Sequence, residues 1–461
     1  MGMSQDGVHA SEACRTTENI DGREARKQAP RKKLGEWNPD ARGHDPLDTV
    51  LSQNAIRDQS LLPLRHGRMA HSPWTYYRGA AAVMAADLAS APHTGIEVQL
   101  CGDAHVLNFG LWNTPERNLV FDLRDFDETL PGPFEWDLKR FLASLVVLSR
   151  ANDVSPESAR TAVRSGYRGY REWIGTYASV PALDIWYDKV ETGQLIAYTA
   201  PDRERELDAA VGKRAAKRSS RGSFKKLTAV VDGIRVIKED PPYRTHALRE
   251  HEAQLQQIID QYHDSVPDHI TALWSRFDVV DAVQQVVGVG SVGMRVFLVL
   301  NEERRTGDPL FLQIKQAAPS VYEQFLGPSA YGNHGSRVIQ GQRMIQSATD
   351  MLVGWTSIDG FDYYVRQFRD GKVIPDGQQI APRLDQFAAA CGHVLARAHA
   401  RSGDPVAIDA YLGNAPRVAD SLVEFAVAYA DQNDRDHAQL HKAVADGIVP
   451  AVDGWPGKNK P

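Results

Sequence analysis

Two short runs in the first third of the chain contain side chains that could carry out phosphoryl transfer. Asp103 and Asn108 follow one strand-like stretch, and Asp122, Asp125 and Asp127 lie at or just beyond the end of a second one. In magnesium-dependent phosphoryl transfer, one Asp orients the substrate hydroxyl, while an Asn and another Asp hold the metal against the nucleotide phosphates. These residue types at strand ends therefore indicate magnesium-dependent phosphoryl transfer.

Strands are the elements expected to position these side chains. Ile96, Val98 and Leu100 alternate with polar residues, which is the pattern of a half-buried strand. The chain leaves this strand at Gly102 and presents the first Asp. Residues 119–121 are a second short apolar strand, which delivers the cluster of carboxylates.

A glycine-rich segment much later in the chain could bind phosphates. Gly288, Gly290, Ser291 and Gly293 lie between strand-like stretches, and no helix follows directly, unlike in a dinucleotide-binding turn. Lys315 ends a following strand, in the sequence Leu-Gln-Ile-Lys, which is close to the lysine strand of kinases. Such a lysine would pair with the α- and β-phosphates of ATP. The alternative is a hairpin whose glycines serve turns and whose lysine is exposed.

A carboxylate should restrain this lysine. Glu323 is the nearest candidate, although it follows only eight residues later. The helix expected from Ser336 onward, which is the usual source of such a carboxylate, contains Arg and Gln instead.

Composition bounds the class of protein. The chain has 461 residues, enough for two or three domains, and its net charge of −6 argues against general nucleic-acid binding. Three cysteines are too few for a disulfide framework or a zinc site, which fits a reducing cytoplasm. No signal peptide and no run of about 18 apolar residues is present, so we expect a cytoplasmic protein that does not span a membrane.

Two basic stretches have alternative interpretations. Arg65, Arg68 and Arg78 could form ion pairs within a helix pair, or they could contact phosphate near Asp103. The lysines and arginines of residues 212–226 could cover a solvated helix, or they could contact an anionic substrate or nucleotide phosphate.

The catalytic run resembles a known motif. Cys-Gly-Asp103-x-x-x-x-Asn108 resembles the catalytic loop of aminoglycoside and choline kinases, which usually begins with His rather than Cys. Asp125-Phe-Asp127 resembles the metal-binding motif that follows that loop. Trp-Asp137-Leu resembles the helix-anchoring Asp-Leu beyond it, so Asp137 is expected to hydrogen-bond the catalytic loop.

Most of the chain from about residue 60 also resembles the bacterial family catalogued as domain of unknown function 2252. The runs that carry this resemblance are residues 101–110, 125–140, 287–293, 341–346 and 396–404. The resemblance implies an α+β, protein-kinase-like fold with two lobes and added helices, without naming a substrate.

The order of the motifs is reversed relative to kinases, which place the glycine loop and lysine first. A circular permutation would reconcile the two, with a small β-rich lobe downstream of the catalytic segment and helix 383–401 packed beside the Asp103 strand. The expected division is a mobile arm at 1–45, a catalytic segment at 46–278, a nucleotide-binding lobe at 279–370 and a helical part at 371–461.

The resemblance implies ATP and Mg²⁺ as cofactors. Asp103 would accept the proton of the attacking hydroxyl, and Asn108 and Asp125 would bind Mg²⁺, with Asp127 or Asp122 as alternates. The choice between Asp122 and Asp125 as the primary ligand stays open. The phosphate acceptor, a small molecule or a protein, is not identified by the sequence.

Two other functions are consistent with the sequence. The pieces Gly102–His105 and Gly332–His334 resemble parts of binuclear phosphoesterase sites, although the early Asp-x-His of such sites is missing. A pseudokinase that binds nucleotide as a regulator is the third possibility.

Overall fold

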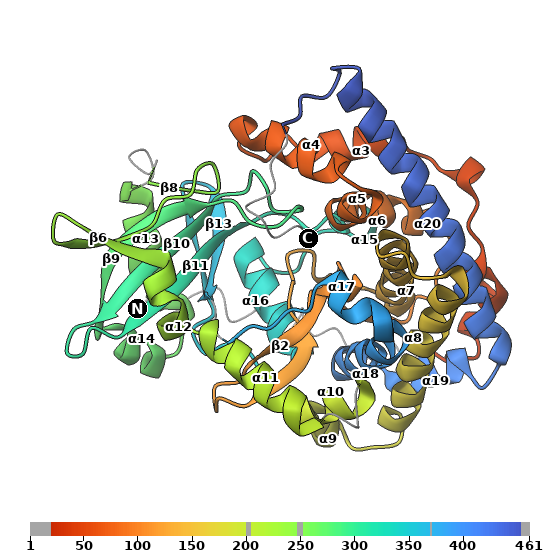
Figure 1. Cartoon of the computed structure of the whole chain (residues 1–461). Helices are drawn as coiled ribbons and strands as arrows, with labels where there is room; N and C mark the ends of the chain where they lie inside the picture. Colours follow the sequence, from red (N-terminus) through yellow and green to blue (C-terminus); the bar gives the residue numbers. More distant parts are fainter. Residues whose placement is uncertain (1–19, 200–203, 247–251, 369–370, 453–461) are drawn as a thin grey trace, which may run out of the picture.

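The protein combines a helical part with a part built around an antiparallel β-sheet. A computed structural model describes residues 20–199, 204–246, 252–368 and 371–452. In Figure 1 the sheet lies on one side of the molecule and most long helices lie on the other. This mixture of helices and antiparallel strands is the α+β class that the sequence predicted.

The first half of the chain contributes short strands and many helices. Its helices are α2 (Ala25–Gln28), α3 (Pro46–Ser52), α4 (Leu62–Ala70), α5 (Pro73–Gly79), α6 (Ala81–Ala89), α7 (Phe134–Ala151), α8 (Pro156–Tyr177), α9 (Ala182–Tyr187), α10 (Thr192–Thr199), α11 (Glu204–Lys217) and α12 (Ser220–Leu227). Its strands are β1 (Glu97–Leu100), β2 (Phe109–Asn113), β3 (Leu119–Leu123), β4 (Leu130–Pro133) and β5 (Val190–Glu191). β1 pairs with β4, and β2, β3 and β5 form a small sheet.

The second half contributes the main sheet and the last helices. Its strands are β6 (Thr228–Val231), β7 (Ile234–Ile237), β8 (Arg244–Thr245), β9 (Phe277–Gln285), β10 (Val296–Glu303), β11 (Pro309–Ala317), β12 (Gly354–Ile358) and β13 (Phe361–Gln367). Its helices are α13 (Glu252–Tyr262), α14 (Asp268–Trp274), α15 (Glu323–Leu326), α16 (His334–Ile345), α17 (Gly377–Ile380), α18 (Leu384–Ser402), α19 (Pro405–Leu412) and α20 (Pro416–Ala445).

The main sheet has six strands in the order β12-β13-β11-β10-β9-β8. Successive residues of β10 point to opposite faces: Phe297 and Val299 pack in one apolar core with α13 and α14, and Leu298 and Leu300 pack in another beside the β6–β7 hairpin. Because both faces are covered, this strand is a continuous apolar run rather than an alternating one.

The sheet part is larger than the predicted small lobe at 279–370. The β6–β7 hairpin, β8, α13 and α14 all precede residue 277 and pack on or pair with the main sheet. These elements have no strong sequence pattern that separates them from the helical part.

The helical part is built around α7, α8, α18 and α20. Glycines let α8 and α18 approach closely, because a Cβ on Gly169 would lie 2.3 Å from the carbonyl oxygen of Ala389. The end of α18 reaches β1, where the backbone N–H of Gln99 donates to Ser402 Oγ at 3.1 Å. This is the position beside the Asp103 strand that was expected for helix 383–401.

Residues 20–45 pack against the helical part, whereas residues 1–19 of the predicted arm lie outside the described residues. Arg26 Nε donates to the carbonyl oxygen of Tyr411 at 2.9 Å, and Arg31 Nη1 donates to that of Leu412 at 2.8 Å. These contacts satisfy the free carbonyls at the end of α19. Across the described ranges, no helix combines the length and apolar character needed to cross a membrane.

Candidate active site

Asp103 lies in the turn that follows β1, and α7 holds that turn in place. Asp137, in the first turn of α7, accepts the backbone N–H of Cys101 at 2.7 Å and that of Gly102 at 3.1 Å. Gly102 has a φ of +85°, and a Cβ there would lie 2.3 Å from the carbonyl oxygen of Glu128. Only glycine fits this turn, and Asp137 hydrogen-bonds the loop as the sequence predicted.

The Asp103 carboxylate is desolvated and contacts a buried arginine. Arg140 Nε and Nη2 each lie 2.7 Å from Asp103 Oδ1. Burial raises the pKa of Asp103; Arg140 offsets part of this rise and the charge of Asp125 adds to it. Asn108 donates through Nδ2 to the Asp103 backbone carbonyl at 2.7 Å, which closes the loop. A carboxylate with a raised pKa is a better proton acceptor near neutral pH.

The ion pair between Lys315 and Asp127 joins the sheet part to the catalytic segment. Lys315 on β11 pairs in register with Tyr364 on β13, and the Tyr364 hydroxyl donates to Asp127 Oδ1 at 2.7 Å. Burial alone would raise the pKa of Asp127, but Lys315 and the two hydrogen bonds hold it below its ordinary value. The two predicted half-sites therefore meet at this carboxylate.

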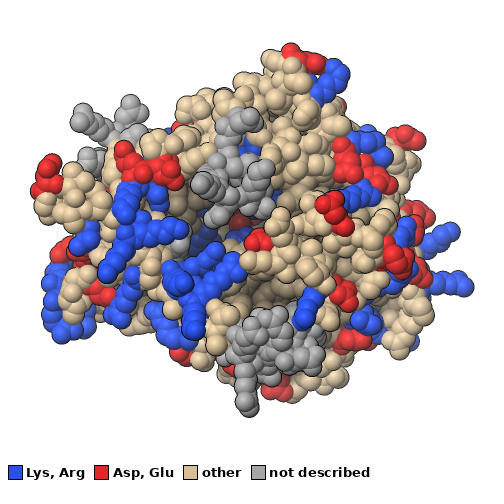
Figure 2. Space-filling model, viewed as in Figure 1, with Lys and Arg blue, Asp and Glu red and all other residues tan. Residues whose placement is uncertain are grey.

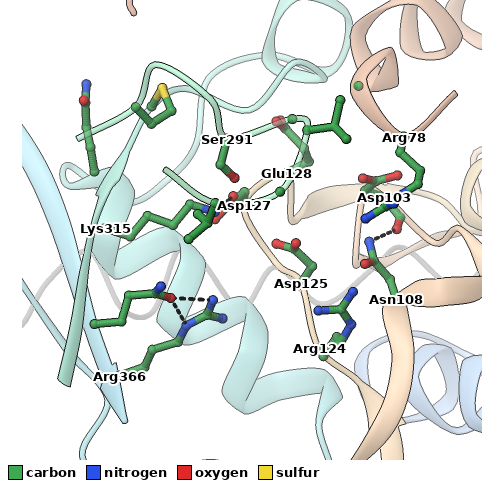
Figure 3. Close-up of a pocket in the computed structure, with 18 of the residues that line it drawn as sticks. Arg78, Asp103, Asn108, Arg124, Asp125, Asp127, Glu128, Ser291, Lys315 and Arg366 are labelled. Atoms are coloured by element: carbon green, nitrogen blue, oxygen red, sulfur yellow. Dashed lines mark hydrogen bonds and ion pairs between the residues drawn. The ribbon is translucent and has the colours of Figure 1, made fainter. Parts of the chain in front are cut away.

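Residues 122–128 form a carboxylate run, and its other two aspartates, Asp122 and Asp125, have different surroundings. Asp125 makes no hydrogen bond or ion pair with another described residue and points into the cavity (Figure 3). Asp122 is fully buried, forms an ion pair with Arg397 and accepts the backbone N–H and hydroxyl of Ser347 at 2.8 and 2.7 Å. Of the two candidates for the primary metal ligand, Asp125 is the one whose oxygens are available.

The glycine-rich segment connects β9 to β10 and is fastened by arginines of the helical part. Arg68 donates to the carbonyl oxygen of Gly288, and Arg57 Nη1 donates to that of Val292 at 2.6 Å. Gly288 has a φ of +61°, and a Cβ built on it would meet no atom within 4 Å. The segment is thus held from behind and leaves open space at Gly288.

The expected pairing of Glu323 with Lys315 is wrong, because Lys315 pairs with Asp127 instead. Glu323 accepts the backbone N–H of Ser320 at 2.9 Å and lies 3.7 Å from Arg337 on α16. Arg337 in turn donates to the carbonyl oxygen of Asp127 at 2.8 Å. Helix α16 thus provides an arginine rather than a carboxylate at this place, and that arginine fixes the backbone at Asp127.

One cavity of about 790 Å³ collects these groups, within the range of roughly 300–1,000 Å³ that is typical of small-molecule sites. The predicted site residues that line it are Asp103, Asn108, Asp125, Asp127, Gly288, Gly290, Ser291 and Lys315. Among the described residues, Asp122, Gly293 and Glu323 are predicted site residues that do not line it.

Positive charge dominates the lining of the cavity. Its basic residues are Arg57, Arg65, Arg78, Arg124, Arg214, Lys217, Arg218, Lys226, Lys315, Arg366 and Lys372. Its acidic residues are Asp103, Asp125, Asp127 and Glu128. Figure 2 shows Lys and Arg side chains gathered beside a hollow in the middle of the molecule. This excess of cations favours an anionic ligand such as a nucleotide.

Several lining residues were missed by sequence reasoning. Arg124 stands inside the carboxylate run, so its position was a usable signal. Arg366 lies near the end of β13, which pairs with the lysine strand β11, and was a weaker signal. Lys372 gave no signal, because it reaches the cavity only through the pairing of its neighbour Val373 with Leu111 of β2.

The carboxylates suit a metal that arrives with a nucleotide. No three His, Cys, Asp or Glu side chains within the described ranges converge as a metal site of their own. Mg²⁺, however, is usually held by one or two carboxylates together with phosphate oxygens and water. Asp125, which has no partner among the described residues, and the side-chain oxygen of Asn108 fit that arrangement.

The two pieces of a phosphoesterase site are not brought together. Asn333 caps α16, where its Oδ1 accepts the backbone N–H of Ser336 at 2.7 Å. None of residues 332–334 lines the cavity, whereas Asp103 and His105 do.

The chain matches one family model. The model described as "Uncharacterized protein conserved in bacteria (DUF2252)" covers residues 57–443. This range includes the catalytic loop, the carboxylate run, the glycine-rich segment and Lys315. No match was found among the curated proteins or the solved structures. Because the family model covers most of the chain, the protein belongs to this bacterial family.

Proposed function

We propose that the protein is a phosphotransferase that moves the terminal phosphoryl group of magnesium-bound ATP to a hydroxyl acceptor. One observation carries the proposal: Lys315 contacts Asp127, so the glycine-rich segment, the lysine strand and Asp103 share one cavity. Phosphoryl transfer is achieved mainly by positioning and charge stabilisation, and these are the parts that provide both.

We further infer a protein-kinase-like fold that is circularly permuted. The glycine connection between β9 and β10, Lys315 on β11, helix α16 and strands β12 and β13 follow one another in the order of a kinase small lobe. The catalytic loop, strands β2 and β3 and the Asp125 run follow one another in the order of a kinase large lobe. The large-lobe segment precedes the small-lobe segment in this chain, which is the reverse of the kinase order.

Several lining residues have a defined task in this proposal. The backbone around Gly290 and Ser291 approaches the ATP phosphates, and Lys315 pairs with them. Asn108 and Asp125 would hold Mg²⁺, which neutralises phosphate charge. Asp103 accepts the proton of the acceptor hydroxyl, and the oxygen of that hydroxyl bonds to the terminal phosphorus. The bond from that phosphorus to the bridging oxygen breaks, and ADP leaves.

A nucleotide-binding regulator without catalysis is the second candidate. The contact of both Arg140 nitrogens with Asp103 Oδ1 favours it, because this charge-assisted contact weakens the carboxylate as a base. In that case the protein would bind ATP without consuming it, and Asp103 would have no catalytic role.

The decisive experiment compares Asp103→Asn with the wild type. We expect Mg²⁺-dependent consumption of ATP to fall by about 10²–10⁴-fold, the usual contribution of a general base, while MgATP still raises the unfolding temperature. Asp431→Asn is the matched control, because Asp431 pairs with Arg150 on the exposed surface. Binding of MgATP with no turnover in either protein would favour the regulator, and no binding at all would refute both.

A further inference from the structure

Three cations lie around Asp125 on one side of the cavity. Arg124 donates through Nε and Nη2 to the carbonyl oxygen of Leu107, at 3.0 and 2.9 Å. Arg366 donates through Nε and Nη2 to Gln313 Oε1, at 3.1 and 2.9 Å. Figure 3 shows both guanidinium groups below Asp125, on the side away from Ser291. Each arginine is thus fixed along one edge and keeps its Nη1 for another partner.

Lys372 is the third cation, and its ammonium group makes no hydrogen bond or ion pair with another described residue. Burial holds the pKa of Lys372 well below its ordinary value, and the charges of Arg366 and Arg124 lower it further. A half-buried lysine without a counter-ion among the described residues is costly for a folded protein, and it therefore calls for an explanation.

The nearby carboxylates do not neutralise this group. Asp350 is occupied by backbone N–H groups, those of Gln367 at 2.6 Å and Leu352 at 2.9 Å. Asp125 is the proposed metal ligand. Once Asp125 holds Mg²⁺, no carboxylate that the structure describes near the three cations has free oxygens.

The backbone that carries Lys372 is held rigidly. Arg218 Nη1 donates to the Lys372 carbonyl oxygen at 3.2 Å, and Arg214 Nη2 donates to that of Ile374 at 3.3 Å. Lys217 and Lys226 are exposed beside them and line the same cavity. Figure 2 shows the resulting positive surface next to the hollow. Such a surface attracts anions and guides them inward.

We propose that Arg124, Arg366 and Lys372 form a second anion subsite, which binds the phosphate group of a phosphorylated acceptor. Guanidinium groups with a free edge are well suited to phosphate oxygens. A magnesium nucleotide at Lys315 would neutralise only part of the positive charge of the cavity, because the metal cancels much of the phosphate charge. That the bound molecule is a phosphoryl acceptor rests on the proposed function. That these three residues bind a phosphate group does not.

The test measures binding of inorganic phosphate and of glycerol 3-phosphate to the full chain by titration calorimetry, with glycerol as the uncharged control. In Lys372→Met and in Arg366→Met we expect both anions to bind at least about tenfold more weakly, because each variant removes a charged hydrogen-bond donor to the phosphate. Lys213→Met is the matched control, because Lys213 is exposed on the same helix as Lys217 and does not line the cavity. Unchanged affinity in both cavity variants would overturn the proposal.

The stability of the ligand-free protein separates binding from a structural role. Because Lys372 is half-buried and has no counter-ion among the described residues, Lys372→Met should unfold at the same temperature as the wild type or higher. Lys372→Arg, which keeps the charge, should retain phosphate binding within a few-fold. A lower unfolding temperature of Lys372→Met with unchanged phosphate affinity would make Lys372 structural and overturn the subsite.

Repeating the titration in saturating MgADP identifies the source of the phosphate. Retained binding of glycerol 3-phosphate supports an acceptor subsite. Displacement by MgADP would assign these cations to the nucleotide and overturn the acceptor. If neither MgADP nor MgATP binds but phosphate binding still depends on Lys372, the proposed function fails and the phosphate subsite stands.

Discussion

Three carboxylates within six residues of one another have three different environments in this protein. Asp122 neutralises the buried Arg397, Asp127 pairs with Lys315, and Asp125 between them has no partner among the described residues. A buried carboxylate that is already paired gains little by binding a metal, because it must first give up its partner. The one unpaired carboxylate is therefore the strongest candidate for Mg²⁺.

Glu128, at the end of the same run, should make stability depend on pH. Burial raises the pKa of Glu128 to about 7, although the backbone N–H of Val321 donates to it at 2.8 Å. Its folded-state pKa lies above its unfolded value of about 4.3. The folded form therefore favours the protonated carboxyl, and this contribution to stability is lost as pH rises toward 7.

We expect the difference in unfolding free energy between wild type and Glu128→Gln to show this effect. The wild type should lose stability relative to the variant as the pH rises from about 4.5 to about 7, because only the wild type must ionise a buried carboxyl. Urea unfolding at several pH values measures the difference. A wild type that gains stability relative to the variant over this range would contradict a raised pKa.

At the scale of elements, the connection between β9 and β10 is the part on which the proposed nucleotide binding depends. It is held from behind by Arg57 and Arg68, and open space remains at Gly288. A phosphate can approach the backbone only where no side chain intervenes. The glycines are thus needed for access as much as for conformation.

Gly290→Ala tests this requirement with little effect on folding. A Cβ on Gly290 would lie 3.5 Å from the carbonyl oxygen of Arg78, an ordinary van der Waals contact, so stability should change by no more than about 0.5 kcal/mol. The added methyl group should weaken MgATP binding by about tenfold, because it restricts the approach of phosphates to the backbone. Calorimetric titration measures the loss of affinity.

Gly43→Ala is the control for this substitution. A Cβ on Gly43 would meet nothing within 4 Å, and the residue does not line the cavity. Equal nucleotide affinity in Gly290→Ala and Gly43→Ala would mean that the glycine-rich segment does not bind phosphates.

At the scale of the whole molecule, the cavity exists because two parts of the chain close on each other. The Lys315–Asp127 ion pair spans 188 residues of sequence, and the hydroxyl of Tyr322 donates to the Gly102 carbonyl at 2.7 Å across a similar separation. The first contact links β11 to the carboxylates after β3, and the second links the segment that follows β11 to the Asp103 loop. A ligand between the parts must touch residues from each.

Hydrogen exchange should report this bridging. MgADP is expected to slow amide exchange in residues 286–295 and in residues 123–128 together, because one nucleotide contacts both segments. Helix α20 should exchange at its original rate and serves as the internal control. Protection of only one of the two segments would show that they do not share a nucleotide.

Many local features could be predicted from the sequence because they depend on near neighbours. Ser155 caps α8, where it accepts the backbone N–H of Ser158 at 3.2 Å, as its position before Pro156 indicated. Asp232 and Gly233, a residue pair that favours a tight hairpin turn, form the turn between β6 and β7, with φ values of 50° and 78°. Strand β13 covers Phe361–Gln367, a run whose aromatic and β-branched residues favour a strand.

The sequence by itself determined the element types, the family and a set of candidate residues, because caps, alternation and turns are encoded within a few positions. Tertiary structure alone decided which candidates meet. It paired Lys315 with Asp127 rather than Glu323, buried Asp122 against Arg397 and brought Lys372 into the cavity. The physical reason is that charges pair with the partner that folding brings close, and sequence separation does not set that distance.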